Sequence, residues 1–384
     1  MRFEFATASR ILFGPDTIKD AVPIIAEMGA SALLLTGKSA DRVKSFRADL
    51  IRNGIRVIDF AVCSEPTIEM VTEGAELARK NQCDIVIGIG GGSVIDGGKA
   101  IAAMITNPGN LLDYLEVIGK GAPLTKSPAP CVAVPTTAGT GAEVTWNAVI
   151  KSTRHSVKVS LRSPMMLPDL VVADPLLTRS MSPSITASTG LDALTQLIEP
   201  AVSRKANPVT DALCREGIGR VAVSLPRVYS NGDDLDAREE MLLSSLLSGI
   251  TLANAGLGAV HGLAGALGGM FPIPHGVICG RLLPFVMEAN VNAIQKRMSD
   301  SPVLHRFDEI ARIITGNPSA NAKDGVKWIQ ELCSNLNIPP LSRFGLEESH
   351  FVSVIEKAKQ ASSIKGNPID LTDEELLDCL KRAL

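Results

Sequence analysis

The chain has 384 residues, of which 45% are hydrophobic and 21% charged, and its formal net charge at pH 7 is -3. This balance is typical of a folded globular protein and excludes wholesale disorder. The small negative charge, without a dense run of Lys or Arg, excludes a surface built to bind nucleic acid. A chain of this length exceeds what one hydrophobic core usually holds, so we expect two domains.

The cysteines and the hydrophobic segments indicate the cellular compartment. Seven cysteines are scattered along the chain and are never spaced as CxxC, which predicts reduced thiols. The N-terminus lacks the apolar run and cleavage site of a signal peptide. No stretch approaches the roughly 18 apolar residues that a membrane span needs. We therefore expect a cytoplasmic protein that does not enter a membrane.

From the N-terminus to about residue 180, short aliphatic runs alternate with amphipathic stretches. This alternation predicts a parallel sheet wound with helices. The predicted strands are residues 31–36, 56–60, 84–89 and 131–135. Each is nearly continuous in apolar character, as expected of a strand that is covered on both faces.

A glycine-rich turn follows the third predicted strand. Gly90, Gly91, Gly92 and Ser93 lead into a predicted helix that begins near Ser93 and contains Asp96. Bare backbone N–H groups and the positive end of a helix favour an anion, and a pyrophosphate would suit them. A tight strand-to-helix turn without a ligand is the alternative at this point.

A second polar turn follows the fourth predicted strand and contains Thr136, Thr137 and Thr140. Because ligands of open α/β sheets gather at the carboxyl ends of strands, these two turns could grip one dinucleotide. Lys158 could pair with its ribose or phosphate, or could simply be a solvated lysine. Trp146 and Asn147 could contact the substrate, although Trp146 could equally belong to the core.

After about residue 180 the pattern becomes helical, and strand-like runs nearly vanish. A helix is expected to start at Ser182 and another at Thr372, because a hydroxyl side chain caps a helix N-terminus. We therefore predict an α/β dinucleotide-binding domain over residues 1–180 and an all-helical metal and substrate domain over residues 181–384. A cleft between them would hold the substrate, and Leu252 is expected to line it.

Taken together, the motifs resemble those of the iron-containing (group III) alcohol dehydrogenase family. The resemblance runs nearly end to end and rests on residues 11–15 (ILFGP), 90–96 (GGGSVID), 135–141 (PTTAGTG) and 367–375 (NPIDLTDEE). It implies the architecture shared with dehydroquinate synthases, in which an α/β domain binds the dinucleotide and a helical domain binds a metal. It also implies self-association, as a homodimer or a higher homo-oligomer, for which Phe3 and Phe5 could form a pairing edge.

The family resemblance also bears on the choice of cofactor. Many NAD-preferring members carry an Asp after the second strand, where its carboxylate repels a 2'-phosphate. The matching residues here are Gly37, Lys38 and Ser39. Since the acid is missing and a lysine and a hydroxyl are present, both NADP and NAD remain possible, and NADP is favoured.

In the family, the metal is held by an Asp and a His four residues apart and by two further His residues fourteen apart. Asp192, His261 and His275 match three of these positions, but Gln196 stands at the fourth. An amide oxygen is a weaker donor than imidazole for a transition metal. A further family histidine near the substrate is replaced by Gly265. The resemblance thus implies a site for Fe²⁺ or Zn²⁺ in which two imidazoles have been lost.

Three functional readings follow from this altered site. The first is an NAD(P)-dependent oxidoreductase that interconverts a small alcohol and its aldehyde or ketone, with the metal polarising the oxygen. The second is a metal-independent carbonyl or maleylacetate-type reductase, in which protonated His261 or His275 stabilises charge on the carbonyl. The third is a non-redox lyase-type or non-catalytic dinucleotide-binding protein. Asp192 could alternatively cap a helix, and both histidines could be structural.

Overall fold

The protein is described here by a computed structural model that covers residues 2–37, 43–107, 109–155 and 157–384. It contains two compact units. The first, called here the α/β unit, is Ala6–Thr137 with Gly141–Ser180. The second, the helical unit, is Met181–Leu384 with Ala138–Thr140 and the N-terminal residues up to Phe5. The division into domains at residues 1–180 and 181–384 stays a prediction.

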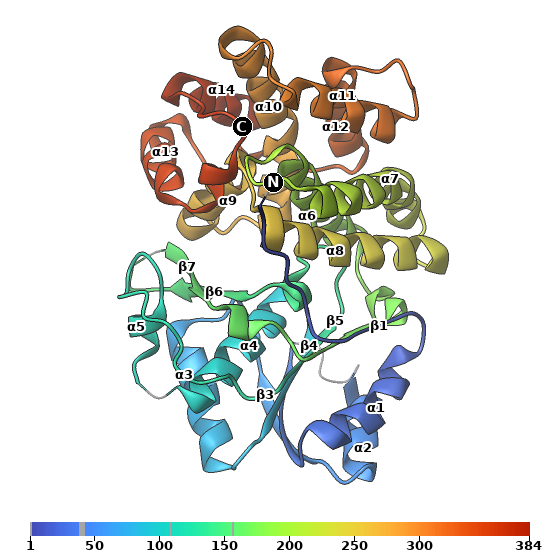
Figure 1. Cartoon of the computed structure of the whole chain (residues 1–384), viewed down its shortest axis with the longest axis vertical. Helices are drawn as coiled ribbons and strands as arrows, with labels where there is room; N and C mark the ends of the chain where they lie inside the picture. Colours follow the sequence, from blue (N-terminus) through green and yellow to red (C-terminus); the bar gives the residue numbers. More distant parts are fainter. Residues whose placement is uncertain (1, 38–42, 108, 156) are drawn as a thin grey trace. The chain divides into compact units, whose positions relative to one another are not determined.

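The α/β unit contains the predicted parallel sheet. Its strand order is β1-β8-β5-β4-β2-β3, and all neighbouring strands are parallel (Figure 1). The four predicted strands are confirmed, and β1 and β8 are two short strands that the sequence did not indicate. The strands are β1 (Ile11–Phe13), β2 (Ser31–Thr36), β3 (Arg56–Ala61), β4 (Ile85–Gly90), β5 (Cys131–Pro135) and β8 (Leu170–Ala173).

Alternate residues of the central strands enter two different cores. Leu33 and Val86 belong to the core that contains residues of α3 (Ile68–Lys80) and α4 (Gly92–Thr106). Leu34 and Ile87 belong to the core that contains residues of α1 (Thr17–Met28) and α2 (Lys44–Arg52). Because successive side chains of a strand point to opposite faces, both faces of the sheet are covered, which explains the continuous apolar runs.

The order of the strands reverses direction between β2 and β4. From β2 the chain continues to β3 on one side, whereas β4 continues to β5 on the other. Ligands of open α/β sheets bind at such a switch point, outside the carboxyl ends of the strands. The unit also has an antiparallel hairpin, β6 (Asn147–Ser152) with β7 (Val157–Arg162). Its short helices are α5 (Leu111–Tyr114), η2 (Ala142–Val144), η3 (Pro164–Met166) and η4 (Pro175–Thr178).

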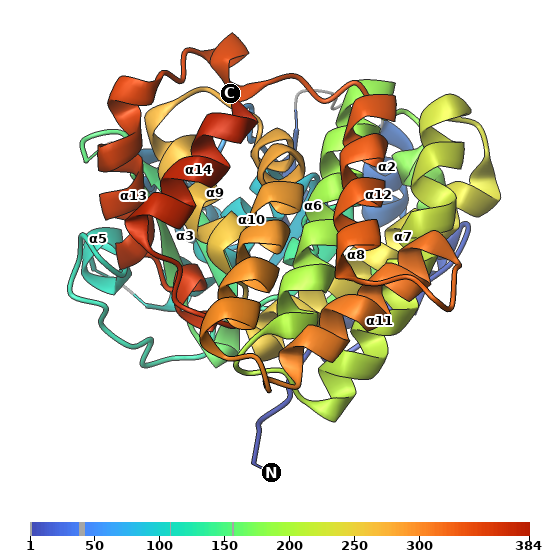
Figure 2. The same cartoon turned by 90° about the horizontal axis from the view of Figure 1, so that it is seen from above.

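The helical unit is built around α6 and α10, which pack against each other with the other helices on both sides (Figure 2). Ser182 caps α6 and Thr372 forms a capping box at α14, so both predicted helix starts are confirmed. The helices are α6 (Pro183–Val202), α7 (Pro208–Ser230), α8 (Leu235–Ala255), α9 (Ala259–Met270), α10 (His275–Arg297), α11 (Val303–Thr315), α12 (Ala322–Asn335), α13 (Phe351–Gln360) and α14 (Asp373–Ala383). The 3-10 turns η5 (Leu341–Phe344), η6 (Glu348–His350) and η7 (Ser363–Gly366) connect the last of these.

Two glycines let α10 approach α6 closely. A Cβ atom on Gly276 would lie 2.0 Å from the carbonyl oxygen of Ser188, and one on Gly280 would lie 2.6 Å from Cδ1 of Leu191. A larger residue at position 276 would require a helix to move, because it meets backbone, whereas one at position 280 would require the Leu191 side chain to shift. The close approach brings the first turns of α10 against the middle of α6.

By length and composition alone, α10 is apolar enough to cross a membrane. However, 72% of its apolar window is buried inside the chain. Burial of this extent is what a core helix of a globular unit shows.

Candidate active site

Four side chains from three helices of the helical unit converge on one point. Asp192 comes from α6, His261 from α9, and His275 and Cys279 from α10. One ligand atom of each lies within 4.8 Å of the others. Asp192 Oδ1 is 3.4 Å from Nε2 of His261 and 3.7 Å from Nε2 of His275. We call these four residues the metal cluster.

The metal cluster fits a divalent cation. Asp192 is only 2% exposed, and its Oδ1 accepts no hydrogen bond from the described residues. A buried carboxylate oxygen without a hydrogen bond is costly, and a cation shared with the two nearby imidazoles would satisfy it. Asp192 lies in the middle of α6, so the alternative of a helix cap is wrong.

Glu199 fixes the orientation of His261. Its Oε2 is 2.6 Å from Nδ1 of His261, and its Oε1 accepts a hydrogen bond from the Val260 N–H at 2.7 Å. The carboxylate therefore holds the proton on Nδ1 and leaves the lone pair of Nε2 directed at the cluster. Asn367, from one of the family motifs, accepts a hydrogen bond from the Ala259 N–H at 3.1 Å and so helps to cap the same helix.

The electrostatics of the cluster favour positive charge. Burial opposes protonation of His261, but interactions with Cys279, Glu199 and Asp192 outweigh it and raise the pKa of His261 well above its usual value. Partial burial also opposes protonation of His275, but interactions with Cys279 and Asp192 raise its pKa above the usual value. The pKa of Asp192 is lowered by the two imidazoles, against the effect of burial. The same negative groups would attract a divalent cation, which would displace the proton from the ligand nitrogen of each imidazole.

Gln196, predicted as a ligand, lies one turn after Asp192 on α6 and is 4% exposed. Its Oε1 accepts a hydrogen bond from Oγ of Ser248, on α8, at 2.9 Å. The Ser248 hydroxyl is also 2.8 Å from the Ser245 carbonyl, so the amide oxygen shares this donor, and its coordination of a metal stays a prediction.

The cluster is open on the side of His275. The His275 side chain is 40% exposed, whereas those of Asp192 and His261 are 3% and 6% exposed. Gly265, where the family has a further histidine, has open space beyond its Cα, since an added Cβ would meet no atom within 4 Å. Leu252, the predicted substrate residue of α8, is half-buried.

In the α/β unit, several predicted cofactor residues meet at the switch point of the sheet. Gly90 ends β4, Gly91 caps α4, and Gly92 and Ser93 form its first turn, whose N–H groups have no partner inside the helix. A Cβ on Gly37 would lie 3.8 Å from Val94 on α4, so the turn after β2 is adjacent. Lys38 and Ser39 lie outside the described residues.

The threonines after β5 are divided between the two units. The Thr136 N–H donates to the Gly90 carbonyl at 2.9 Å, and a Cβ on Gly91 would lie 3.5 Å from Oγ1 of Thr137. These two residues therefore belong to the switch-point edge of the α/β unit. Thr140 belongs to the helical unit, where neighbouring Gly139 packs tightly against Thr189.

Two charged residues that were predicted to bind cofactor have protein partners. Asp96 pairs with buried Lys99 at 3.0 Å and accepts a hydrogen bond from the Val149 N–H at 3.1 Å. Lys158 forms an ion pair with Glu65. The contacts of Asp96 tie α4 to β6, and the pair of Lys158 ties β7 to the segment before α3. Cofactor contacts of Asp96 and Lys158 remain predictions.

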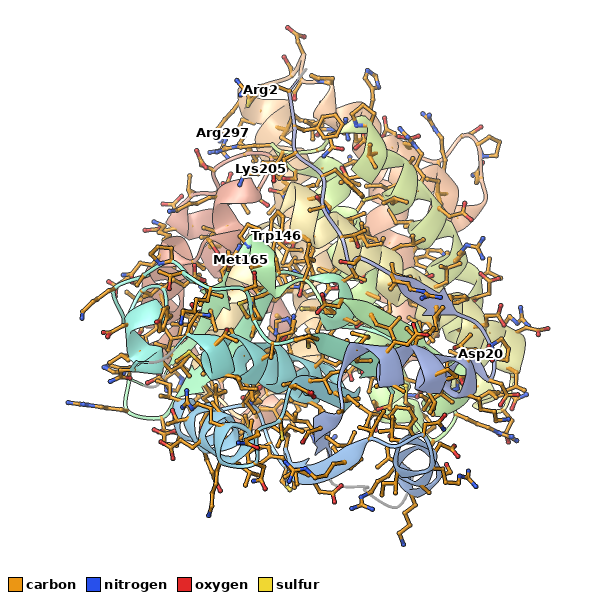
Figure 3. The ribbon with its side chains drawn as sticks, turned by 60° about the horizontal axis from the view of Figure 1, so that its bottom comes forward. Arg2, Asp20, Trp146, Met165, Lys205 and Arg297 are labelled. Atoms are coloured by element: carbon orange, nitrogen blue, oxygen red, sulfur yellow. The ribbon has the colours of Figure 1, made fainter. Side chains whose placement is uncertain are left out.

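Trp146 and Asn147 begin the hairpin and are both half-buried. The Trp146 carbonyl accepts a hydrogen bond from the Ser163 N–H at 3.1 Å, which places it beside the turn that contains Met165 (Figure 3). The Asn147 carbonyl accepts a hydrogen bond from Nζ of Lys99. The half-burial of Trp146 means that it is not a fully buried core residue.

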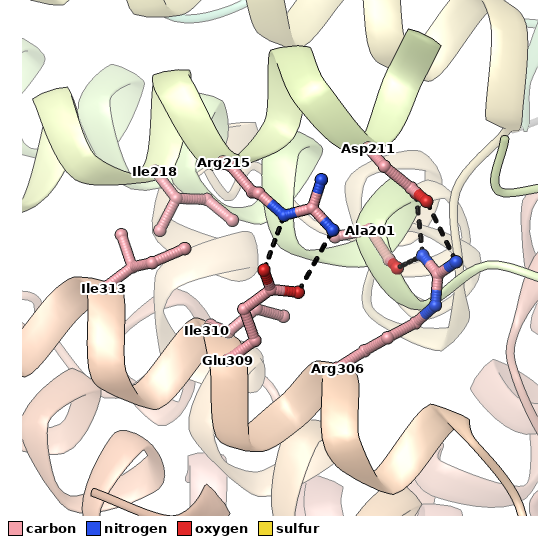
Figure 4. A pocket seen from close by; sticks show the side chains of 8 residues that line it. All are labelled: Ala201, Asp211, Arg215, Ile218, Arg306, Glu309, Ile310 and Ile313. Carbon is pink, nitrogen blue, oxygen red and sulfur yellow. Dashed lines mark hydrogen bonds and ion pairs between the residues drawn. The ribbon is translucent and has the colours of Figure 1, made fainter. Parts of the chain in front are cut away.

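A separate pocket in the helical unit contains none of the predicted site residues (Figure 4). Its charged side chains pair with each other: Arg215 with Glu309 at 2.6 Å, and Arg306 with Asp211 at 2.7 Å. These pairs join α7 to α11, so the pocket is better explained as part of helix packing.

Sequence reasoning missed two residues of the site, Cys279 and Glu199. The helical spacing that identified the predicted ligands could also have identified these two residues. Cys279 follows His275 by four residues, and Glu199 follows Asp192 by seven, so each shares a helix face with a predicted ligand.

Comparisons with known proteins identify the family. Residues 8–175 match the iron-containing alcohol dehydrogenase family, and residues 186–384 match the C-terminal part of that family. The 1,3-propanediol dehydrogenase of Klebsiella pneumoniae is 34% identical over 394 residues, which cover 99% of this chain and 98% of that protein. A crystal structure of a 1,3-propanediol oxidoreductase is 32% identical with a TM-score of 0.91, and covers 100% of both chains. The sulfoacetaldehyde reductase of Bifidobacterium kashiwanohense, solved in complex with NAD+, is 28% identical with a TM-score of 0.87, and the match covers 99% of this chain and 98% of that one. The chain belongs to the iron-containing alcohol dehydrogenase family.

Proposed function

We propose that this protein interconverts a small alcohol and its aldehyde or ketone by hydride transfer with a nicotinamide dinucleotide, and that Asp192, His261 and His275 hold the metal that assists it. The oxidoreductase class follows from the family. The observation that carries the metal assignment is the buried Asp192 oxygen without a hydrogen-bond partner, beside a histidine oriented by Glu199. No observation favours the lyase-type or non-catalytic alternatives.

The residues of the cluster have distinct tasks. When bound, the metal supplies a Lewis acid that polarises the alcohol or carbonyl oxygen. Asp192 supplies the negative charge that attracts the cation, and Glu199 holds the Nδ1 proton of His261, so that Nε2 is the nitrogen that would coordinate the cation. His275 lies on the exposed side, from which a small substrate can approach.

We propose that the dinucleotide phosphates bind at the N-terminus of α4, along Gly90, Gly91, Gly92 and Ser93. The support is the position of this helix start at the switch point of the sheet, next to Gly37. NADP is the proposed preference because Lys38 stands where an acid would repel a 2'-phosphate. The ratio of kcat/KM for NADPH and NADH, in the wild type and in Lys38→Asp, tests this.

We also propose a cytoplasmic enzyme that self-associates as a homodimer or a higher homo-oligomer. Phe3 and Phe5 support self-association, because these aromatic side chains are 46% and 38% exposed. Sedimentation of the wild type and of the Phe3→Ser, Phe5→Ser double variant tests the proposal.

The proposed function is tested by metal content and activity together. Elemental analysis of protein purified without chelator should find iron or zinc near one per chain, and NAD(P)H oxidation with small aldehydes should follow the metal on removal and readdition. His261→Ala should lose both. His305→Ala, on an exposed residue of α11, is the matched control and should keep both. A metal-free wild type that oxidises NAD(P)H at full rate would instead support the metal-independent reductase.

A further inference from the structure

We propose that Cys279 is the fourth protein ligand of the metal in this chain, and that its thiolate makes the site selective for zinc over iron. The proposal rests on the proposed function, since it concerns the same cluster. It adds a ligand that is absent from the Asp and His set of the family.

Three of the six separations among the four ligand atoms are close to those of tetrahedral coordination, and all six are within 4.8 Å. Bonds of about 2.0–2.1 Å to nitrogen and oxygen and about 2.3 Å to sulfur place neighbouring ligand atoms about 3.3–3.6 Å apart. The observed separations are 3.4 Å and 3.7 Å from Asp192 Oδ1 to the two imidazoles. Cys279 Sγ is 3.8 Å from Nε2 of His261. These three distances need to change by only a few tenths of an ångström.

The helix geometry directs Cys279 to the cluster. His275 and Cys279 are four residues apart on α10, so their side chains share one face of the helix. Next to Cys279, Gly280 packs against the side chain of Leu191, the neighbour of Asp192, so the two helices approach each other closely there. Cys279 is fully buried and is not in a disulfide.

Cys279 replaces a donor that Gln196 does not supply. The Gln196 amide oxygen lies 2.9 Å from Oγ of Ser248, whose single proton is shared with the Ser245 carbonyl at 2.8 Å, whereas Cys279 Sγ has the cluster atoms around it. Two histidines, one aspartate and one thiolate restore a set of four protein ligands. Since soft thiolate ligands favour zinc, and divalent zinc binds more tightly than divalent iron at most sites, the change of ligand shifts the preferred metal. A substrate oxygen would then enter as a fifth ligand, which catalytic zinc accommodates.

The test uses spectroscopy of the whole protein. Cobalt-substituted wild type is expected to show the near-ultraviolet charge-transfer band of a cobalt–thiolate bond together with visible ligand-field bands. Cys279→Ser should keep ligand-field bands and lose the charge-transfer band. Its zinc affinity should fall by more than the roughly 10–100-fold typical of losing an outer partner. Gln196→Ala should keep the band, as should Cys379→Ser, which removes another buried thiol of the helical unit.

A second measurement needs no variant. X-ray absorption at the zinc edge of the wild type should find one sulfur at about 2.3 Å among nitrogen and oxygen neighbours. A first shell without sulfur, or a cobalt protein with ligand-field bands and no thiolate band, would overturn the role of Cys279 and leave the proposed function standing. If cobalt and zinc do not bind at all, while NAD(P)H is still oxidised, the metal-assisted mechanism itself fails, and the ligand role of Cys279 with it.

Discussion

The contact between Glu199 and His261 gives the sharpest prediction about the metal site. Glu199→Gln keeps the size of the side chain but replaces two acceptor oxygens with one. In the wild type both oxygens accept: one from the Val260 N–H at 2.7 Å and one from Nδ1 of His261 at 2.6 Å. Glutamine can satisfy only one of these two donors.

Two outcomes are possible for the variant, and both are measurable. If the amide oxygen stays on Val260, the NH2 group faces Nδ1 of His261 and moves its proton to Nε2, which then cannot bind metal. Metal affinity should fall about 10–100-fold, or about 1.4–2.7 kcal/mol. If the amide oxygen stays on His261, the Val260 N–H loses its buried partner, which costs about 1–3 kcal/mol of unfolding free energy.

The assay is a competition titration of zinc against a chromophoric chelator, with urea unfolding of the metal-free protein alongside. Glu309→Gln, which breaks an exposed ion pair with Arg215, is the control and should change neither quantity by much. A Glu199→Gln protein with wild-type zinc affinity and wild-type stability would refute the assignment of Glu199 as the residue that orients His261.

Three further predictions concern single positions. Gly276→Ala should lower the free energy of unfolding, measured in urea, by about 1–3 kcal/mol, and it should weaken zinc binding. The added Cβ would lie 2.0 Å from the Ser188 carbonyl oxygen and push His275 away from α6. Unchanged stability and zinc affinity would contradict the close helix contact. Gly265→Ala should instead raise the free energy of unfolding by about 0.5–1 kcal/mol, because the site is helical and open; a loss of stability in urea would show that the space is occupied. Burial raises the pKa of Glu143 from 4.5 to about 7, so the native state binds the extra proton between these values and stability falls as pH rises through that window. Glu143→Gln should flatten this fall, by about 3 kcal/mol between pH 4.5 and 7 in urea titrations, and an unchanged pH profile would show that Glu143 is not responsible.

Much of the fold could be predicted from local sequence patterns. The runs at residues 31–36 and 131–135 are nearly continuous in apolar character because both faces of the sheet are covered, so this continuity and their short length were enough to identify β2 and β5. The hydroxyls of Ser182 and Thr372 marked helix starts because a cap acts within one turn. The short strands β1 and β8 were not found, since three or four apolar residues carry too little pattern.

The sequence by itself determined the family, the sheet, the glycine turn before α4 and the face of α6 that carries Asp192. Only the tertiary structure decided which side chains complete the site around Asp192. Spacing along one helix places Gln196 and Glu199 near Asp192, but it does not say which neighbouring helix each side chain meets. The packing of α8 against α6 places Ser248 beside the side chain of Gln196. The start of α9 places His261 beside the carboxylate of Glu199. The glycines of α10 bring Cys279 to the metal cluster, because coordination depends on distances across helices rather than along one.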